Sequence, residues 1–124
     1  MVIGATKEPD VSVIVATYNR SEILRGTLES LINQETAGLQ YEVIVVDNLS
    51  SGRRQNLSTA RSSPRFTFVE HDVTEPLTIE GKLDWILHFA SPASPPKYLS
   101  IPVETLRANG EGAYRLLEIA HCFV

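Results

Sequence analysis

The chain has 124 residues, a hydrophobic content of 43% and a charged content of 21%, which are ordinary values for a folded globular protein. This length predicts one domain over residues 1–124, with a core of its own but little room for a complete α/β enzyme. The net charge of -4 argues against a nucleic-acid partner, and no apolar run is long enough to span a membrane.

A single cysteine, Cys122, cannot form a disulfide within the chain. The N-terminus lacks the basic segment followed by an apolar one that marks a secretory signal. We therefore expect a reducing compartment, the cytoplasm.

The first part of the chain predicts a loose arm, a strand and a helix. Residues 1–10 are polar and end in a Pro-Asp pair, and the apolar run at 11–16 predicts the first strand. A helix capped by Ser21 or Asn19 follows. Its apolar residues recur at helical spacing: Ile23, Leu24, Thr27, Leu28, Leu31 and Ile32.

The second strand, residues 41–47, is a continuous apolar run typical of a central parallel strand, and it ends in Asp47. Two strands joined through a helix predict a right-handed parallel crossover. Because such sheets bind ligands at the carboxyl ends of their strands, Asp47 is a candidate to hold a ribose diol or a nucleotide. The alternative is that Asp47 only caps the turn that follows it.

A short helix and two further strands are predicted next. The polar segment 53–62 predicts a short helix that turns Leu57 and Ala60 inward. Apolar runs at 65–70 and 83–90 predict the third and fourth strands.

The C-terminal part predicts a loop and a long helix. Residues 91–96 are rich in proline and serine and predict a loop. The last helix is predicted over 102–120, with Pro102 in its first turn. Gly110 and Gly112 weaken this helix, and we expect them where it packs closely on the sheet. Its predicted apolar face includes Val103, Leu106, Tyr114 and Leu117.

The histidines and the cysteine predict no reactive site. His88 lies inside the fourth predicted strand, so we expect a hydrogen-bonded core histidine rather than a metal ligand. The pair His71 and Asp72 has no further ligand at metal-site spacing. Cys122 follows His121, but no orienting acid comes after it, so no catalytic residue and no metal site are predicted.

Residues 11–48 resemble the start of a family 2 glycosyltransferase of the GT-A fold. The resemblance rests on a strand, the loop T-Y-N-R, a helix ending in L-x-N-Q, and a strand ending in V-D-N. It covers about a third of the chain. It implies that Thr17, Tyr18 and Asn19, together with Asp47, hold the uridine of a sugar donor.

Residues 44–120 resemble a different family, the extended short-chain dehydrogenases, and within it the UDP-glucuronate decarboxylase and dTDP-glucose 4,6-dehydratase type. The segments HFASPASPP and P-x-E-T-L-x-A-N-x-x-G carry this resemblance over more than half of the chain. It implies NAD-dependent nucleotide-sugar chemistry, with Asp47 on the adenosine ribose. The cofactor-binding residues that it implies are Asp47, Asn48, Ser50, Ser51, Gly52, Asp72, Val73, Phe89, Ala90 and Ser91.

The two resemblances overlap at the sequence V-V-D-N, which ends the second strand in both families. Because the two families share their topology at this join, we predict a recombined or engineered chimera. Residues 11–48 would form a glycosyltransferase-like unit and residues 49–124 a dehydratase-like part. A natural fusion is the alternative.

Both resemblances are incomplete at the motifs that carry chemistry. The glycine-rich turn of the dehydrogenases corresponds to residues 16–21, which contain no glycine, so Tyr18 and Asn19 would occupy the space that the pyrophosphate needs. The Tyr-x-x-x-Lys pair that carries the chemistry of the dehydrogenases is missing, since neither Tyr98 nor Tyr114 has a lysine four residues later. The metal-binding D-x-D motif of the glycosyltransferases is missing as well. We therefore expect no required cofactor, and at most weak binding of NAD or UDP.

Together these features predict an α/β fold: a truncated Rossmann-like, doubly wound parallel sheet of four strands in the order 3-2-1-4, with covering helices. The fourth strand would be an apolar edge, which predicts a homodimer or swapped oligomer formed through this edge or the last helix. The preferred function is a folded chimera without catalysis. The alternatives are a fragment of an NAD-dependent nucleotide-sugar epimerase, dehydratase or decarboxylase, a fragment of a glycosyltransferase, and a self-assembling scaffold.

Overall fold

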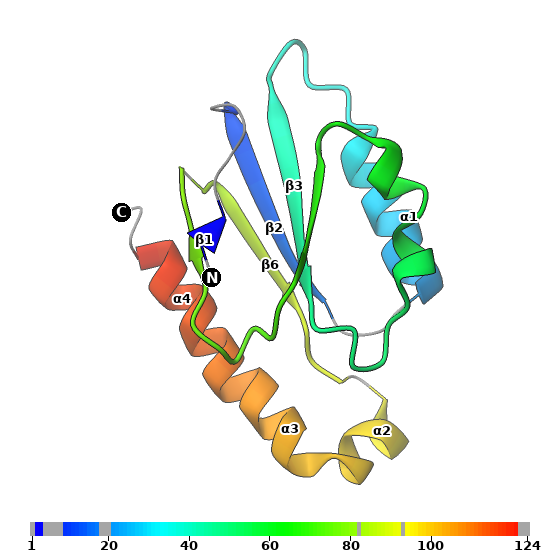
Figure 1. Ribbon diagram of the computed structural model, residues 1–124, viewed down its shortest axis with the longest axis vertical. Coiled ribbons are helices and arrows are strands. Elements are labelled where there is room, and N and C mark those ends of the chain that lie inside the picture. The colour runs from blue at the N-terminus through cyan, green and yellow to red at the C-terminus, as the bar shows by residue number, and fades with distance from the viewer. Residues whose placement is uncertain (1, 4–8, 18–20, 82, 93, 122–124) are drawn as a thin grey trace.

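The computed structural model of the protein describes residues 2–3, 9–17, 21–81, 83–92 and 94–121, and places helices on both sides of a parallel sheet (Figure 1). None of the described helices combines the length and apolar character needed to cross a membrane. The strands are β1 (Val2–Ile3), β2 (Val11–Thr17), β3 (Tyr41–Asp47), β4 (Phe66–Glu70), β5 (Thr78–Ile79) and β6 (Trp85–Phe89). The helical elements are α1 (Ser21–Ile32), η1 (Arg54–Leu57), η2 (Ala60–Ser62), α2 (Pro95–Ser100), α3 (Pro102–Arg107), η3 (Ala108–Gly112) and α4 (Ala113–His121).

Four strands form one parallel sheet in the order β4-β3-β2-β6. Counted along the four predicted strands, this is the order 3-2-1-4, so the predicted fold class and topology are confirmed. In the central strand β2, Ala16 pairs with Val46 of β3 on one side and with His88 of β6 on the other. Because all pairs are parallel, the carboxyl ends of the strands gather at one edge of the sheet, which is where parallel sheets bind ligands.

The two central strands of the sheet, β2 and β3, are covered on both faces, which explains their continuous apolar runs. Successive side chains of a strand point to opposite faces. In β3, Val43 and Val45 pack with α1, whereas Ile44 and Val46 pack with α4. Each of these four side chains is at most 2% exposed. The two hydrophobic cores therefore share β2 and β3 as their common layer.

The first ten residues contain a short strand where the sequence predicts a loose arm. Val2 and Ile3 pair in parallel with Thr78 and Ile79, as a separate two-stranded sheet. Strands of two residues leave no periodicity that can be read from a sequence. Ile79 is buried in the core on the α4 face, so β5 extends that core.

The helix predicted at 53–62 is two short 3-10 turns, η1 and η2, neither of which has a side-chain cap. An uncapped segment of this length gains too little from helical hydrogen bonds to form a full helix. Leu57 and Ala60 are nevertheless buried against the α1 face, as predicted.

The C-terminal helical region begins earlier than predicted. Helix α2 starts at Pro95, inside the predicted 91–96 loop, because proline in the first turn of a helix sacrifices no hydrogen bond. From Pro102 onward the chain is helical through α3, the π-helical turn η3 and α4. The long helix predicted from Pro102 is therefore confirmed, although a wider turn interrupts it.

The apolar face predicted for this last helix is wrong. The buried residues of α4 are Leu116 and Ile119, and α3 buries none. Figure 1 shows α3 continuing beyond the end of the sheet, which agrees with the absence of buried residues in this helix. The residues predicted to face inward are all more than half exposed: Val103 at 65%, Leu106 at 72%, Tyr114 at 56% and Leu117 at 68%.

Only one of the two helix glycines lies at a close approach. A Cβ at Gly112 would lie 3.0 Å from Cγ2 of Val73, whereas one at Gly110 would meet nothing within 4 Å. The close-packing prediction therefore holds for Gly112 alone. Its missing side chain lets the helix lie against the segment after β4, which carries Asp72 and Val73.

Candidate functional site

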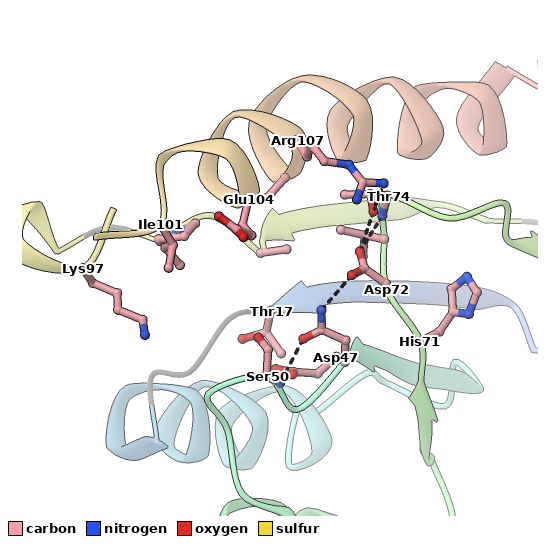
Figure 2. Close-up of a pocket in the computed structure, with 15 residues that line it drawn as sticks. Thr17, Asp47, Ser50, His71, Asp72, Thr74, Lys97, Ile101, Glu104 and Arg107 are labelled. Carbon is pink, nitrogen blue, oxygen red and sulfur yellow. Dashed lines mark hydrogen bonds between the residues drawn. The ribbon is translucent and has the colours of Figure 1, made fainter. Parts of the chain in front are cut away.

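A cavity of about 250 Å³ lies at the carboxyl ends of β2 and β3 (Figure 2). Thr17 and Asp47 are the last residues of these two strands and line it. The opposite wall comes from α2 and α3, through Lys97 and Arg107. Because α2 and α3 lie far from β2 in the sequence, the cavity exists only when the whole sheet is assembled.

Asp47 is the most buried charged group of this cavity, with 5% of its surface exposed. One of its oxygens accepts a hydrogen bond of 2.7 Å from the backbone N–H of Leu49, which has a left-handed φ of 54°. Burial raises the pKa of the Asp47 carboxyl above its usual value, and the hydrogen bond from Leu49 opposes that shift. Asp47 therefore caps its turn, as one sequence interpretation predicts, and it also lines the cavity, where a ligand role stays a prediction.

Asp72 is held in place by its neighbours. Its Oδ1 accepts hydrogen bonds from the backbone N–H and the hydroxyl of Thr74, at 2.9 and 2.8 Å. Its Oδ2 accepts a 2.9 Å bond from the side-chain amide of Asn48. Burial alone would raise the pKa of Asp72, but these bonds and the charge of Arg107 outweigh it and lower the pKa. Asp72 is thus a paired carboxylate at neutral pH, with its orientation fixed.

Arg107 ties helix α3 to the segment that carries Asp72. Its guanidinium donates to the hydroxyl of Thr74 at 3.3 Å and lies 3.5 Å from Glu75. Its Nε donates to Glu111 one helical turn later, at 3.1 Å. Since its partners are two acids and a hydroxyl, Arg107 mainly positions the wall of the cavity.

The predicted cofactor-binding residues divide into two groups. Six of them line the cavity: Asp47, Asn48, Ser50, Asp72, Val73 and Ala90. The other four, Ser51, Gly52, Phe89 and Ser91, do not line it.

Each of these four residues has a different environment. The Ser51 hydroxyl is buried without a hydrogen-bond partner among the described residues, and Phe89 is 49% exposed. Ser91 is hydrogen-bonded to the side chain of Asn109. A Cβ at Gly52 would lie 3.8 Å from both oxygens of Asp47, so Gly52 borders that carboxylate from behind. Of the alternative nucleotide-binding set, Thr17 and Asp47 line the cavity, and Tyr18 and Asn19 lie outside the described residues.

Sequence reasoning missed the helical wall of the cavity. This wall includes Lys97, Glu104 and Arg107. His71 and Thr74, from the segment after β4, also line the cavity and were not predicted to do so. Lys97 lies in a helix that was not predicted. Glu104 and Arg107 lie in a predicted helix. Their positions in the sequence do not predict that this helix lies opposite the carboxyl ends of the strands.

His88 departs from the prediction of a hydrogen-bonded core histidine. Both of its ring nitrogens are buried without a hydrogen-bond partner in the described part of the chain. It lines a groove of about 570 Å³ in which α4 presents Ala113 and Leu116, and neither of these side chains can form a hydrogen bond. No group of three or more His, Cys, Asp or Glu residues in the described ranges is placed to hold a metal ion.

Comparison with known proteins identifies two relationships. The sequence model of the family described as Glycosyl transferase family 2 matches residues 12–75. The chain is also 41% identical over 95 residues to UDP-glucuronic acid decarboxylase 1 of Arabidopsis thaliana, covering 77% of this chain and 21% of that protein. It is 47% identical over 90 residues to decarboxylase 5 of the same plant, covering 73% of this chain and 26% of that one. It is 45% identical over 80 residues to UDP-glucuronic acid decarboxylase 1 of Danio rerio, covering 64% of this chain and 19% of that protein.

These matches bear out the two resemblances read from the sequence. The chain spans about a fifth to a quarter of the length of these decarboxylases. The lengths of the two kinds of match together exceed 124 residues, so part of the chain matches both families.

A solved structure shares the fold. The UDP-Glc/GlcNAc 4-epimerase from Campylobacter jejuni superposes with a TM-score of 0.62 at 21% identity. The superposition covers 91% of this chain and 34% of the epimerase. At this level of identity the similarity concerns the arrangement of the strands and helices alone.

Proposed function

Since the chain belongs to glycosyl transferase family 2 through residues 12–75 and also matches UDP-glucuronic acid decarboxylases, we propose that it is a recombined nucleotide-binding domain. In this proposal, the cavity at the strand ends binds the nucleoside part of a nucleotide weakly. The two families that the sequence resembles both act on nucleotide sugars. We propose binding alone for this chain, without catalytic turnover.

One observation carries the proposal: the buried carboxylate of Asp47 lines a cavity at the carboxyl edge of a parallel sheet. One Asp47 oxygen accepts the Leu49 N–H, and a carboxylate has acceptor capacity beyond one bond. A ribose diol offers two hydroxyl donors of the kind this carboxylate accepts.

Weak binding without chemistry agrees with the size and pairing of the site. The cavity of about 250 Å³ is smaller than the roughly 300 to 1,000 Å³ of pockets that enclose a ligand well. Arg107 is paired with Glu75 and Glu111, and Asp72 is paired with Thr74. Groups held in this way position other residues and are poorly placed to exchange a proton with a substrate.

Titration calorimetry with UDP, NAD and UDP-glucuronate tests this function. We expect dissociation constants on the order of 1 mM for whichever nucleotide the cavity accepts. The same samples should release no product over long incubation. Micromolar binding with turnover would replace the proposal by its alternative, a working piece of a nucleotide-sugar enzyme.

A second proposal concerns association, because the strand β6 ends the sheet with an apolar edge. Trp85 is 64% exposed and Phe89 is 49% exposed, and both lie on this strand. An unpaired edge with large apolar side chains pairs readily with another chain. We propose that a second copy of this protein covers β6, which makes the protein a homodimer or a swapped oligomer.

Light scattering coupled to size-exclusion chromatography checks the association. We expect a dimer or larger species, and Trp85→Lys should convert it to a monomer by placing a charge on the edge. Thr67→Lys is the matched control, since Thr67 is exposed on β4 at the opposite edge of the sheet. A monomer for the unsubstituted protein at high concentration would refute the dimer and, with it, the scaffold alternative.

A cytoplasmic location also remains a proposal. It is supported by the single cysteine, since a protein of oxidising compartments commonly uses its cysteines in pairs. Fluorescence of a tagged chain in its host would test it.

A further inference from the structure

The cavity at the strand ends carries groups of opposite charge on its two walls. Asp47 and Asp72 belong to the strand side, and Lys97 reaches in from α2 on the helical side. Figure 2 shows the Lys97 side chain extending toward Thr17 and Ser50, well away from Asp72. A ligand that fits this pattern has hydroxyl donors at one end and negative charge next to them.

Lys97 is the cation of the cavity that is available to such a ligand. The guanidinium of Arg107 is already engaged by Thr74, Glu75 and Glu111. The ammonium of Lys97, by contrast, has no hydrogen bond or ion pair with the residues that the structure describes.

The backbone of Lys97 is fixed on both sides. Its N–H donates to the carbonyl of Ser94 at 2.9 Å, and its carbonyl accepts from the hydroxyl of Ser100 at 2.7 Å. These bonds hold the start of the side chain in place, while the charged end stays free to meet an anion.

The sequence of the turn after β2 creates a need for this cation. A glycine-rich turn lets backbone N–H groups approach a diphosphate closely. Residues 16–21 contain no glycine, so this segment lacks the residue type that permits such a close approach. A diphosphate in this cavity therefore needs its positive partner from another wall, and α2 supplies Lys97.

We propose that Lys97 binds the diphosphate of a nucleoside diphosphate whose ribose lies on Asp47. This inference rests on the proposed nucleotide binding and specifies its ligand class, which UDP-sugars and NAD share. Glu104 lines the same cavity and opposes the binding, because its carboxylate repels the same diphosphate. The pair of Lys97 and Glu104 thus sets the strength of the anion subsite.

The test compares ligands with and without the diphosphate, by calorimetry or by chemical-shift titration. Uridine and adenosine report on the nucleoside site alone, and UDP and NAD add the diphosphate. We expect Lys97→Met to weaken the binding of UDP or NAD by about tenfold, as the loss of a partly exposed charged hydrogen bond predicts, and to leave the binding of the matching nucleoside unchanged.

We expect Glu104→Gln to strengthen the binding of the diphosphate ligand by a few-fold. Added salt should reduce the difference between UDP and uridine in the unsubstituted protein only.

Inorganic pyrophosphate separates failure of this inference from failure of the proposed function. If neither nucleoside binds but pyrophosphate shifts the Lys97 signals and Lys97→Met abolishes that shift, the anion subsite stands and the nucleoside function falls. If nucleosides bind and Lys97→Met leaves the ratio of UDP to uridine affinity unchanged, the assignment of Lys97 is overturned. Absence of binding by UDP, NAD and pyrophosphate overturns it as well. An unchanged melting temperature of the Lys97→Met protein shows that the fold is intact, as expected for an exposed side chain.

Discussion

Leu28→Ala and Leu116→Ala are each expected to lower the free energy of unfolding by about 3 kcal/mol, and both should shift one shared unfolding transition. Leu28 lies on α1, in the part that resembles a glycosyltransferase, and is fully buried. Leu116 lies on α4, in the part that resembles a decarboxylase, and is 4% exposed. A loss of this size is a large share of the roughly 5 to 15 kcal/mol that stabilises a domain.

The expectation of a single transition follows from the sheet. The core on the α1 face and the core on the α4 face both contain side chains of β2 and β3. A cavity left by either leucine therefore weakens packing on strands that the other core also needs. Two sequence parts of different resemblance would then behave as one cooperative unit.

Urea unfolding followed by two signals measures this. Far-ultraviolet circular dichroism reports on all helices and strands, and the fluorescence of the single tryptophan, Trp85, reports on β6 alone. The matched control is Leu117→Ala, beside Leu116 but 68% exposed, which should change stability by about 0.5 kcal/mol or less. Separate midpoints for the two signals would show that the two parts do not fold as one.

The strands and their order were predictable because their sequences obey one strong rule. A strand buried on both faces must be apolar throughout, and Val43 to Val46 meet that rule with almost no exposed surface. The order of the strands followed from the parallel crossover and from the shared topology of the two resembled families. Short elements such as Val2–Ile3 carry no comparable pattern, and they were missed.

The helical wall of the cavity could not be predicted in the same way. Apolar periodicity in a helix predicts burial only if a neighbouring layer covers that helix, and α3 extends past the sheet. Leu106 is therefore exposed, although its spacing in the sequence is that of a core residue. Lys97 and Arg107 line the same cavity as Asp47 although they lie far from it in the sequence, and no local pattern encodes such an arrangement.

His88 shows a different limit of sequence reasoning. A polar residue inside an apolar strand predicts a hydrogen-bond partner, because buried polar groups are almost always paired. The partner depends on the facing helix, and α4 presents Leu116 and Ala113 there. Neither side chain accepts or donates a hydrogen bond, so the general rule fails at this position.

Asp47→Asn is expected to weaken nucleoside binding by about tenfold or more and, at neutral pH, to raise the free energy of unfolding. The first effect follows because an amide replaces one carboxylate oxygen by a donor that faces the ribose hydroxyls. The second follows from burial, which raises the pKa of Asp47 in the folded chain above its unfolded value. The folded state then binds a proton more tightly than the unfolded state. The charged carboxylate therefore costs stability above the folded pKa, and this cost fades as the pH falls toward the unfolded value near 3.8.

Urea unfolding and uridine titration of the same samples, at neutral and at mildly acidic pH, distinguish a binding residue from a cap. Asn at position 47 keeps an acceptor for the Leu49 N–H, so the turn is retained. Asp47→Ala is the control, since it loses that acceptor and should destabilise the turn at both pH values. If Asp47→Asn binds uridine as well as the unsubstituted protein while Asp47→Ala is destabilised, Asp47 is a cap alone. A more stable protein with weaker binding is the result expected when a buried charge is retained for a ligand at a cost to the fold.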